Sequence, residues 1–241
     1  MKVLIHTLVW KRPEATEITY KGFDRIQERL KEAGIDSEVL VTSSEPEHTA
    51  KATDRGYNVF EYKNLPVAEK YDAAMHETLN YEWDFLMGMD SNNLLSDDYI
   101  KRWIEKCNQK ENRFFGSSSF IALDSSKEYI YRYNTRKVYV LSNVGRAARR
   151  DVWETLHKVG SFVTDKERNS KLDGMTNQMV KKFVLGRRGY KHSICKECDG
   201  VLDFKSDVDM HGDVAHIPQR RREEADIPYL IKLFPELQHW V

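Results

Sequence analysis

The stretch that decides the fold is Trp83-Asp84-Phe85-Leu86-Met87-Gly88-Met89, followed by Asp90-Ser91-Asn92-Asn93. Its apolar part has almost no polar interruption, as expected of a strand covered by helices on both faces of a mainly parallel sheet. Its polar part places an acid and an amide two residues apart where the strand ends, so that both can converge on one ligand. A simple polar turn is the alternative, because Asp, Ser and Asn are residues that turns favour.

Strands alternate with helices upstream of this stretch. Strands are predicted at residues 3–8, 37–42 and 57–61, and helices at 20–33 and 66–80. This alternation predicts an open, doubly wound α/β sheet that binds ligands outside the carboxyl ends of its strands. We therefore expect residues 7–12 and 90–93 to lie on one rim of the sheet.

The second half of the chain lacks this regular alternation of strands and helices. Strands are predicted at residues 114–123, 138–141 and 200–205, and Asp151 is predicted to cap a helix. Further helical patterns cover residues 173–185 and 229–234. A chain of 241 residues with no internal repeat suits one domain of mixed architecture.

The composition narrows the classes of function. Lys plus Arg and Asp plus Glu are both 38, so the overall charge gives no case for a polyanionic partner. No apolar run is long enough to span a bilayer, and three cysteines without a secretory leader argue against a disulfide framework. These features predict a cytoplasmic protein.

A family resemblance rests on four segments in a fixed order: Thr7, Lys11-Arg12-Pro13-Glu14, Ala68-Glu69-Lys70-Tyr71-Asp72-Ala73-Ala74, and the strand into Asp90-Ser91-Asn92-Asn93. This order resembles the nucleotide-sugar half of family 2-like glycosyltransferases of the GT-A fold, and the chain looks similar to bacteriophage-encoded members. The resemblance implies a nucleotide-sugar half at residues 1–95 and an acceptor half at 96–241. If the source is a phage, the implied location is the host cytoplasm.

The resemblance also implies roles for individual residues. Thr7 and Arg12 would line the nucleoside pocket, and Lys70 and Asp72 would lie near the base or the diphosphate. Asp90 and Asn92 would form the Asp-x-Asp pair that holds Mn²⁺ or Mg²⁺. Asp72 stands where the family usually has Asn, and Asn92 replaces the second Asp. The loss of one carboxylate predicts weaker metal binding.

A weaker likeness continues into the second half. Leu172-Asp173-Gly174 resembles the acidic motif whose Asp is the general base of inverting members. An N-cap role for Asp173 is the alternative. Residues 201–206 and 209–211 resemble a closing strand and loop, which nominates His211, and after it His216, as a metal ligand and Lys205 as a diphosphate contact. Simple solvation of these side chains is the alternative.

The predicted function is transfer of a sugar from a nucleotide-sugar, most often a UDP-sugar in similar enzymes, to an acceptor hydroxyl with inversion. Arginine groups in the second half leave nucleic acid open as an acceptor, since similar phage enzymes include ones that glycosylate modified DNA bases. One alternative is a nucleotidyltransferase of related fold. Another is a nucleic-acid-binding protein with zinc at Cys195 and Cys198.

Overall fold

The computed structural model describes residues 1–117, 119–124, 126–134, 141, 143–167, 172–185, 200–204 and 223–240. Its first sheet has six strands in the order β3-β2-β1-β4-β9-β6. Their bounds are Lys2–Leu8 (β1), Asp36–Ser43 (β2), Asn58–Glu61 (β3), Phe85–Asp90 (β4), Phe114–Phe115 (β6) and Arg146–Arg149 (β9). Strands β1 to β4 are parallel, and β9 and β6 extend the sheet in antiparallel pairs. The predicted mainly parallel α/β sheet is thus confirmed.

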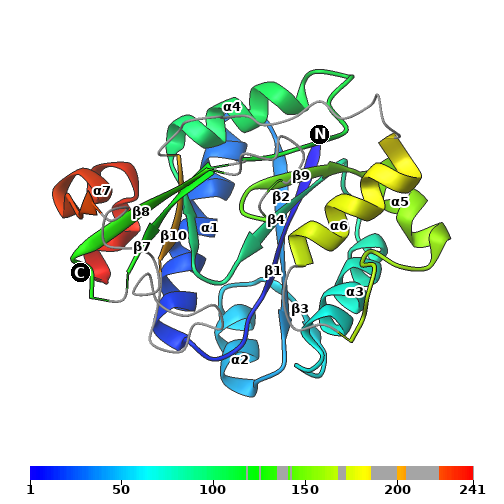
Figure 1. The fold of residues 1–241 in the computed structure, drawn as a ribbon, viewed down its shortest axis with the longest axis horizontal. Helices are drawn as coiled ribbons and strands as arrows, with labels where there is room; N and C mark the ends of the chain where they lie inside the picture. Colours follow the sequence, from blue (N-terminus) through cyan, green and yellow to red (C-terminus); the bar gives the residue numbers. More distant parts are fainter. Residues whose placement is uncertain are drawn as a thin grey trace.

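Helices cover both faces of this sheet (Figure 1). One face carries α1 (Pro13–Glu32), α2 (Pro46–Asp54) and α4 (Asp97–Cys107), and the other carries α3 (Val67–Glu77), α5 (Arg150–Val159) and α6 (Leu172–Val180). Short turns of helix follow α3 at Thr78–Asn80 and α6 at Lys181–Leu185. Within the described ranges, no helix is long and apolar enough to cross a membrane.

Alternation along β1 explains why the sheet needs both helical layers. Val3 and Ile5 belong to the core under α1, whereas Leu4 belongs to the core under α3. Successive strand side chains point to opposite faces, so a strand buried on both sides supplies two cores at once. The same pattern in β4 sends Met87 to the α1 side and Leu86 to the α3 side.

A second sheet of five strands lies beside the first and carries the C-terminal helices (Figure 1). Its order is β11-β8-β7-β10-β5. The bounds are Asn93–Leu95 (β5), Ser119–Leu123 (β7), Tyr129–Asn134 (β8), Val201–Phe204 (β10) and Glu223–Glu224 (β11), with α7 at Ile227–Leu233 and a final 3-10 helix at Pro235–His239. Their apolar side chains form a third core with the start of α1.

Two local predictions are wrong. Residues 114–123 form two strands in different sheets, because β6 pairs with β9 whereas β7 pairs with β8 and β10. Asp151 lies inside the first turn of α5 rather than at its cap, and its carboxylate accepts hydrogen bonds from Arg149 at 2.7 and 2.9 Å. Of the strand predicted at 138–141, residues 138–140 lie outside the described residues.

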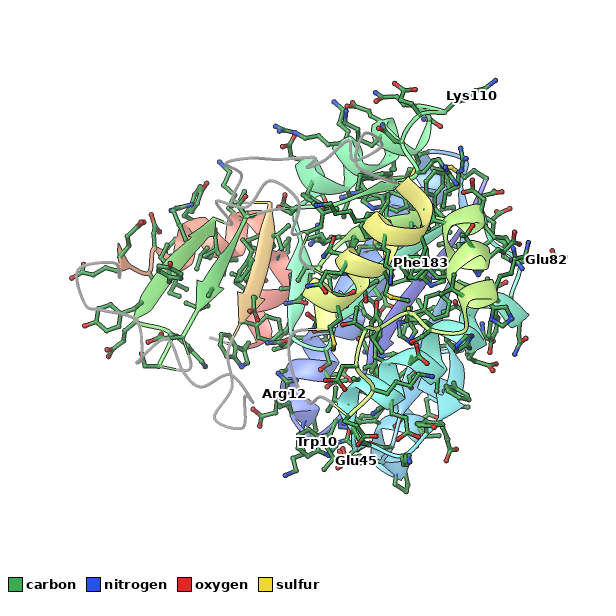
Figure 2. The ribbon with its side chains drawn as sticks, turned by 45° about the vertical axis from the view of Figure 1, so that its right-hand side comes forward. Trp10, Arg12, Glu45, Glu82, Lys110 and Phe183 are labelled. Atoms are coloured by element: carbon green, nitrogen blue, oxygen red, sulfur yellow. The ribbon has the colours of Figure 1, made fainter. Side chains whose placement is uncertain are left out.

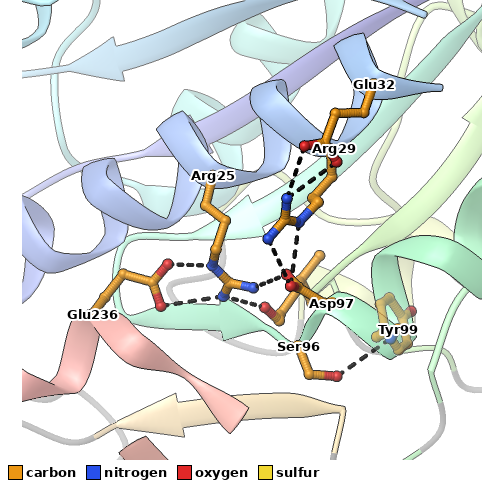
Figure 3. A network of polar contacts seen from close by, with 8 residues as sticks. Arg25, Arg29, Glu32, Ser96, Asp97, Tyr99 and Glu236 are labelled. Carbon is orange, nitrogen blue, oxygen red and sulfur yellow. Dashed lines mark hydrogen bonds and ion pairs between the residues drawn. The ribbon is translucent and has the colours of Figure 1, made fainter. Parts of the chain in front are cut away.

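An ion-pair network ties the C-terminal segment to the first helix (Figure 3). The Arg25 guanidinium donates to both carboxylate oxygens of Glu236, at 2.5 and 3.1 Å, and to the main-chain oxygen of Leu95 at 2.6 Å. It also pairs with Asp97 at 2.5 Å. Since Leu95 ends β5, this network fixes the edge of the second sheet against α1.

Candidate functional site

The carboxyl ends of β1, β2 and β4 meet on one rim of the first sheet. Leu8 lies opposite Asp90 in the parallel pairing of β1 with β4, and the Val9 amide donates to the Thr42 carbonyl of β2 at 3.0 Å. The predicted proximity of residues 7–12 and 90–93 is therefore confirmed. Thr7 itself points into the core under α1, where its hydroxyl is buried and has no hydrogen-bond partner among the described residues.

The turn after β1 is strained. Lys11 and Arg12 both have positive φ, at 53° and 55°, although neither is glycine. For residues with a Cβ this conformation costs about 1–2 kcal/mol each. The turn is held by the Lys11 amide, which donates to Glu45 Oε2 at 2.6 Å, and by Pro13 at the start of α1. Such strain is typical of ligand-binding turns, so it makes this turn a candidate for the site.

The strained turn directs Arg12 toward the end of β4. Its Nη2 lies 3.5 Å from the Ser91 hydroxyl, at the long limit of a hydrogen bond. Figure 2 shows Trp10, Arg12 and Glu45 gathered at one edge of the molecule. The turn thus places a guanidinium beside Ser91, just after β4, and a carboxylate beside the end of β2.

Lys70 is a buried cation behind this rim. Its side chain is 1% exposed, and Nζ donates to the Val9 carbonyl at 2.8 Å, with Ser44 Oγ at 3.3 Å and Asn64 Oδ1 at 3.4 Å. Burial lowers the pKa of Lys70 to about 8, against a smaller opposing effect of Glu45. No carboxylate forms an ion pair with Lys70 in the part of the chain that the structure describes. The ammonium group therefore favours an anionic ligand nearby.

Asp72 lies on a different face of α3 from Lys70. Lys70 and Asp72 are two positions apart in a helix, which separates their side chains by about 200° around the helix axis. They therefore point in different directions. The Asp72 carboxylate accepts from the Ser161 hydroxyl at 2.9 Å and the Phe162 amide at 2.6 Å, and Lys166 Nζ lies 2.6 Å away. These bonds anchor the segment after α5. A nucleotide contact of Asp72 stays a prediction, because the structure does not bring it together with Lys70.

Asp90 is held in place by a chain of polar side chains that sequence analysis missed. Asn143 Nδ2 donates to Asp90 Oδ1 at 2.9 Å, and Arg146 Nη2 donates to Asn143 Oδ1 at 2.8 Å. The same guanidinium nitrogen lies 2.7 Å from the Tyr71 hydroxyl. Arg146 is only 3% exposed. The buried cation fixes which end of the Asn143 amide faces the carboxylate.

Gly88 makes room for this arrangement. A Cβ on Gly88 would lie 2.6 Å from Asn143 Oδ1, closer than such atoms can approach. The glycine in an otherwise apolar strand was the available signal that another group approaches β4 closely at this point. Nothing in the sequence identified that group as Asn143.

Asn92 faces β10. The side chain is 5% exposed, and its Nδ2 donates to Asp203 Oδ1 at 2.7 Å and to the Phe204 carbonyl at 3.0 Å. Next to it, Asn93 Oδ1 accepts the Asp90 amide at 3.0 Å. Asp203 is thus a second carboxylate at this turn, and sequence analysis missed it because strand pairing between β10 and β5 is not visible in the sequence.

The oxygen atoms around Asp90 fit a hard divalent cation. Carboxylate and amide oxygens suit Mg²⁺ and Mn²⁺, which often keep several waters and bind through one or two carboxylates plus phosphate oxygens. Among the described residues, no group of three or more His, Cys, Asp or Glu side chains could hold a metal ion. The site would therefore need phosphate oxygens of a ligand to complete the coordination.

The site residues predicted in the second half of the chain lie either on α6 or outside the described residues. Asp173 is the second residue of α6, within the first turn of the helix. Lys205, His211, His216, Cys195 and Cys198 lie outside the described residues. Their roles stay predictions.

Comparisons with known proteins identify the fold. No protein-family model and no curated protein matches the sequence. Among solved structures, S. aureus TarS 1–349 is similar with a TM-score of 0.59 at 12% identity over 85% of this chain, and its complex with UDP gives 0.56 at 11% over 86%. A longer TarS structure gives 0.53 at 12% over 86% of this chain.

The chain spans only part of these structures, namely 60% and 61% of the two TarS 1–349 chains and 35% of the longer one. At this level of identity the likeness shows the fold alone. The central sheet flanked by helices is that of the GT-A class.

Proposed function

We propose that the chain transfers a sugar from a nucleotide-sugar to an acceptor hydroxyl. The main support for this proposal is the composition of the rim at the ends of the parallel strands. The rim brings together the strained turn at Lys11 and Arg12, the buried Lys70 ammonium and the oriented Asp90 carboxylate. Ligands of open α/β sheets bind outside these strand ends. A basic and acidic rim of this kind suits a diphosphate together with a divalent cation.

We assign UDP as the nucleotide carrier, supported by the similar TarS fold that was solved with UDP. The nucleoside would lie against Val9 and Glu45, close to Lys70 and near Thr7. Arg12 and Lys70 would offset phosphate charge, as Lys205 would from the segment after β10. Asp90, with Asn92 and His211, would bind Mn²⁺ or Mg²⁺, which would stabilise the charge that develops on the departing diphosphate.

The proposed reaction is a single displacement with inversion. The acceptor oxygen attacks the anomeric carbon while the bond from that carbon to the diphosphate oxygen breaks. Asp173 accepts the proton of the acceptor hydroxyl. The acceptor is a hydroxyl on a glycan or a modified DNA base.

The test is incubation with a panel of UDP-sugars, Mn²⁺ and candidate acceptors, with UDP release followed over time. Asp90→Asn and Asp173→Asn are expected to reduce UDP formation at least about a hundredfold, whereas Asp98→Asn on the outer face of α4 should not. Release of pyrophosphate from a nucleoside triphosphate would instead identify a nucleotidyltransferase. Full UDP formation by both site variants would refute the residue assignment.

A further inference from the structure

The pair Asp90 and Asn92 has one carboxylate fewer than an Asp-x-Asp pair, and β10 brings another carboxylate to the same turn. We propose that Asp203 supplies the second negative charge of the cation and diphosphate site, and that Asn92 is an amide because it must bind Asp203. This inference rests on the proposed function and adds Asp203 to the residues that would bind the cation and the diphosphate.

The hydrogen bonds of Asn92 show why an amide stands at this position. An amide NH₂ has two hydrogens, and Asn92 directs both to β10, one to Asp203 Oδ1 at 2.7 Å and one to the Phe204 carbonyl at 3.0 Å. A carboxylate at residue 92 would have no hydrogen to donate. Two oxygens of like charge would then face each other at hydrogen-bond distance, which is strongly unfavourable at a mostly buried position.

The pairing of β10 with β5 places Asp203 beside the turn that carries Asp90. Asp203 lies directly opposite Asn93 in the antiparallel ladder, and such partners have Cβ atoms about 4.5–5.5 Å apart on one face. The Asn93 side chain in turn accepts the Asp90 amide at 3.0 Å. Asp90 and Asp203 therefore border the same turn, although they are far apart in sequence.

Asp203 is the one partly exposed residue of β10. Leu202 and Phe204 are fully buried in the third core on the other face of the strand, whereas Val201, on the same face as Asp203, is fully buried in the first core. A partly exposed carboxylate can bind a cation without a large desolvation cost. Together, Asp90 and Asp203 restore the two negative charges that an Asp-x-Asp pair would have.

Two carboxylates suit a cation that a diphosphate also binds. Mg²⁺ and Mn²⁺ bind nucleotides through one or two protein carboxylates, with phosphate oxygens and waters in the other positions. Among the described residues, no group of three or more His, Cys, Asp or Glu side chains could hold a metal ion, so a cation at this turn would depend on phosphate oxygens as well as on Asp90 and Asp203. A role for Asp203 thus explains why residue 92 is an amide and why two carboxylates suffice at this turn.

The test measures Mn²⁺ binding by calorimetry in the presence of UDP, independently of turnover. Asp203→Asn is expected to raise the Kd for Mn²⁺ at least about tenfold while it leaves UDP binding without metal unchanged. The exchange variant N92D/D203N again has two carboxylates, with the direction of the hydrogen bond between residues 92 and 203 reversed. Its Kd for Mn²⁺ is expected within about threefold of the wild-type value, even though the lost bond to Phe204 lowers its Tm.

Asp98→Asn, which removes an exposed carboxylate of α4, serves as the matched control and should bind Mn²⁺ as the wild type does. Wild-type Mn²⁺ affinity in Asp203→Asn would overturn this inference and leave the proposed function standing. A wild-type chain that binds neither UDP nor Mn²⁺ would overturn both. If Asp203→Asn does not fold, the exchange variant decides, because a folded exchange variant with weak Mn²⁺ binding refutes the proposal.

Discussion

Asn143 Nδ2 donates a 2.9 Å hydrogen bond to Oδ1 of Asp90. Asn143 lies in the segment before β9, and Asp90 is the last residue of β4. The orientation of the amide is set from behind by Arg146, which donates to Asn143 Oδ1. The carboxylate that we propose as a cation ligand is therefore positioned by Asn143. This relationship leads to the first prediction.

Asn143→Ala is expected to weaken UDP binding in the presence of Mn²⁺ by about tenfold or more. A hydrogen bond to a charged group contributes about 1.5–3 kcal/mol, and its loss removes one constraint on the Asp90 carboxylate. Calorimetry with UDP and Mn²⁺ measures the effect. Asn80→Ala removes an exposed amide that donates to Glu77 and serves as control. Equal affinities of the Asn143 variant and the wild type would show that Asp90 needs no such support.

The pH dependence of UDP binding should reveal Lys70. Burial lowers the pKa of Lys70 to about 8, so its positive charge is lost as the pH rises through that value. UDP affinity is then expected to fall between about pH 7 and 9. Lys70→Met should bind UDP weakly and without this step, whereas Lys51→Met, at a surface ion pair with Glu47, should retain it. A step of equal size in both variants would exclude Lys70 as its source.

The same shift has a consequence for stability. The folded chain releases the Lys70 proton near pH 8, whereas an unfolded lysine keeps its proton until about pH 10.4. Between these values the unfolded state binds more protons, so the contribution of Lys70 to the free energy of unfolding rises with pH. Urea titrations at pH 8 and pH 10 measure the free energy of unfolding at each pH. The change in this free energy from pH 8 to pH 10 should be less positive in Lys70→Met than in the wild type.

Asp72 is predicted to hold the segment that leads from α5 toward α6. Asp72→Ala removes the acceptor of the Ser161 hydroxyl, the Phe162 amide and the Lys166 ammonium. We expect a loss of about 2–3 kcal/mol in the free energy of unfolding and faster tryptic cleavage after Lys166. Glu77→Ala, at a half-buried position at the end of the same helix, should change neither. Unaltered cleavage in the Asp72 variant would contradict the anchoring role.

Glu236 should matter for stability far more than a surface acid does (Figure 3). Its side chain is 6% exposed and accepts two hydrogen bonds from Arg25. Glu236→Gln is expected to lower the free energy of unfolding by about 3 kcal/mol, because it leaves the charge of Arg25 with one compensating carboxylate fewer. Glu32→Gln, which breaks the exposed pair with Arg29, should cost about 0.5 kcal/mol or less. Denaturant titrations compare the two variants, and equal losses would refute the distinction.

The first sheet could be predicted from the sequence because its signals are local. The strand at 85–90 is apolar on both faces, and the helix that begins at Pro13 has apolar residues at spacings of three and four. The alternation of such elements also predicted that Leu8 and Asp90 would end on the same rim. The second sheet could not be predicted, because β5 and β10 are more than a hundred residues apart and either could pair with other strands.

For the candidate site too, the sequence predicted some features and not others. The sequence by itself determined that an acid, Asp90, follows a buried strand and that a basic turn follows β1. Only the tertiary structure decided that Asn143 packs against Gly88, that Asp72 points away from Lys70, and that Asp203 accepts a hydrogen bond from Asn92. The physical reason is range: periodicity and turn chemistry act between near neighbours in the chain, whereas these side chains meet through strand pairing and helix packing over long sequence separations.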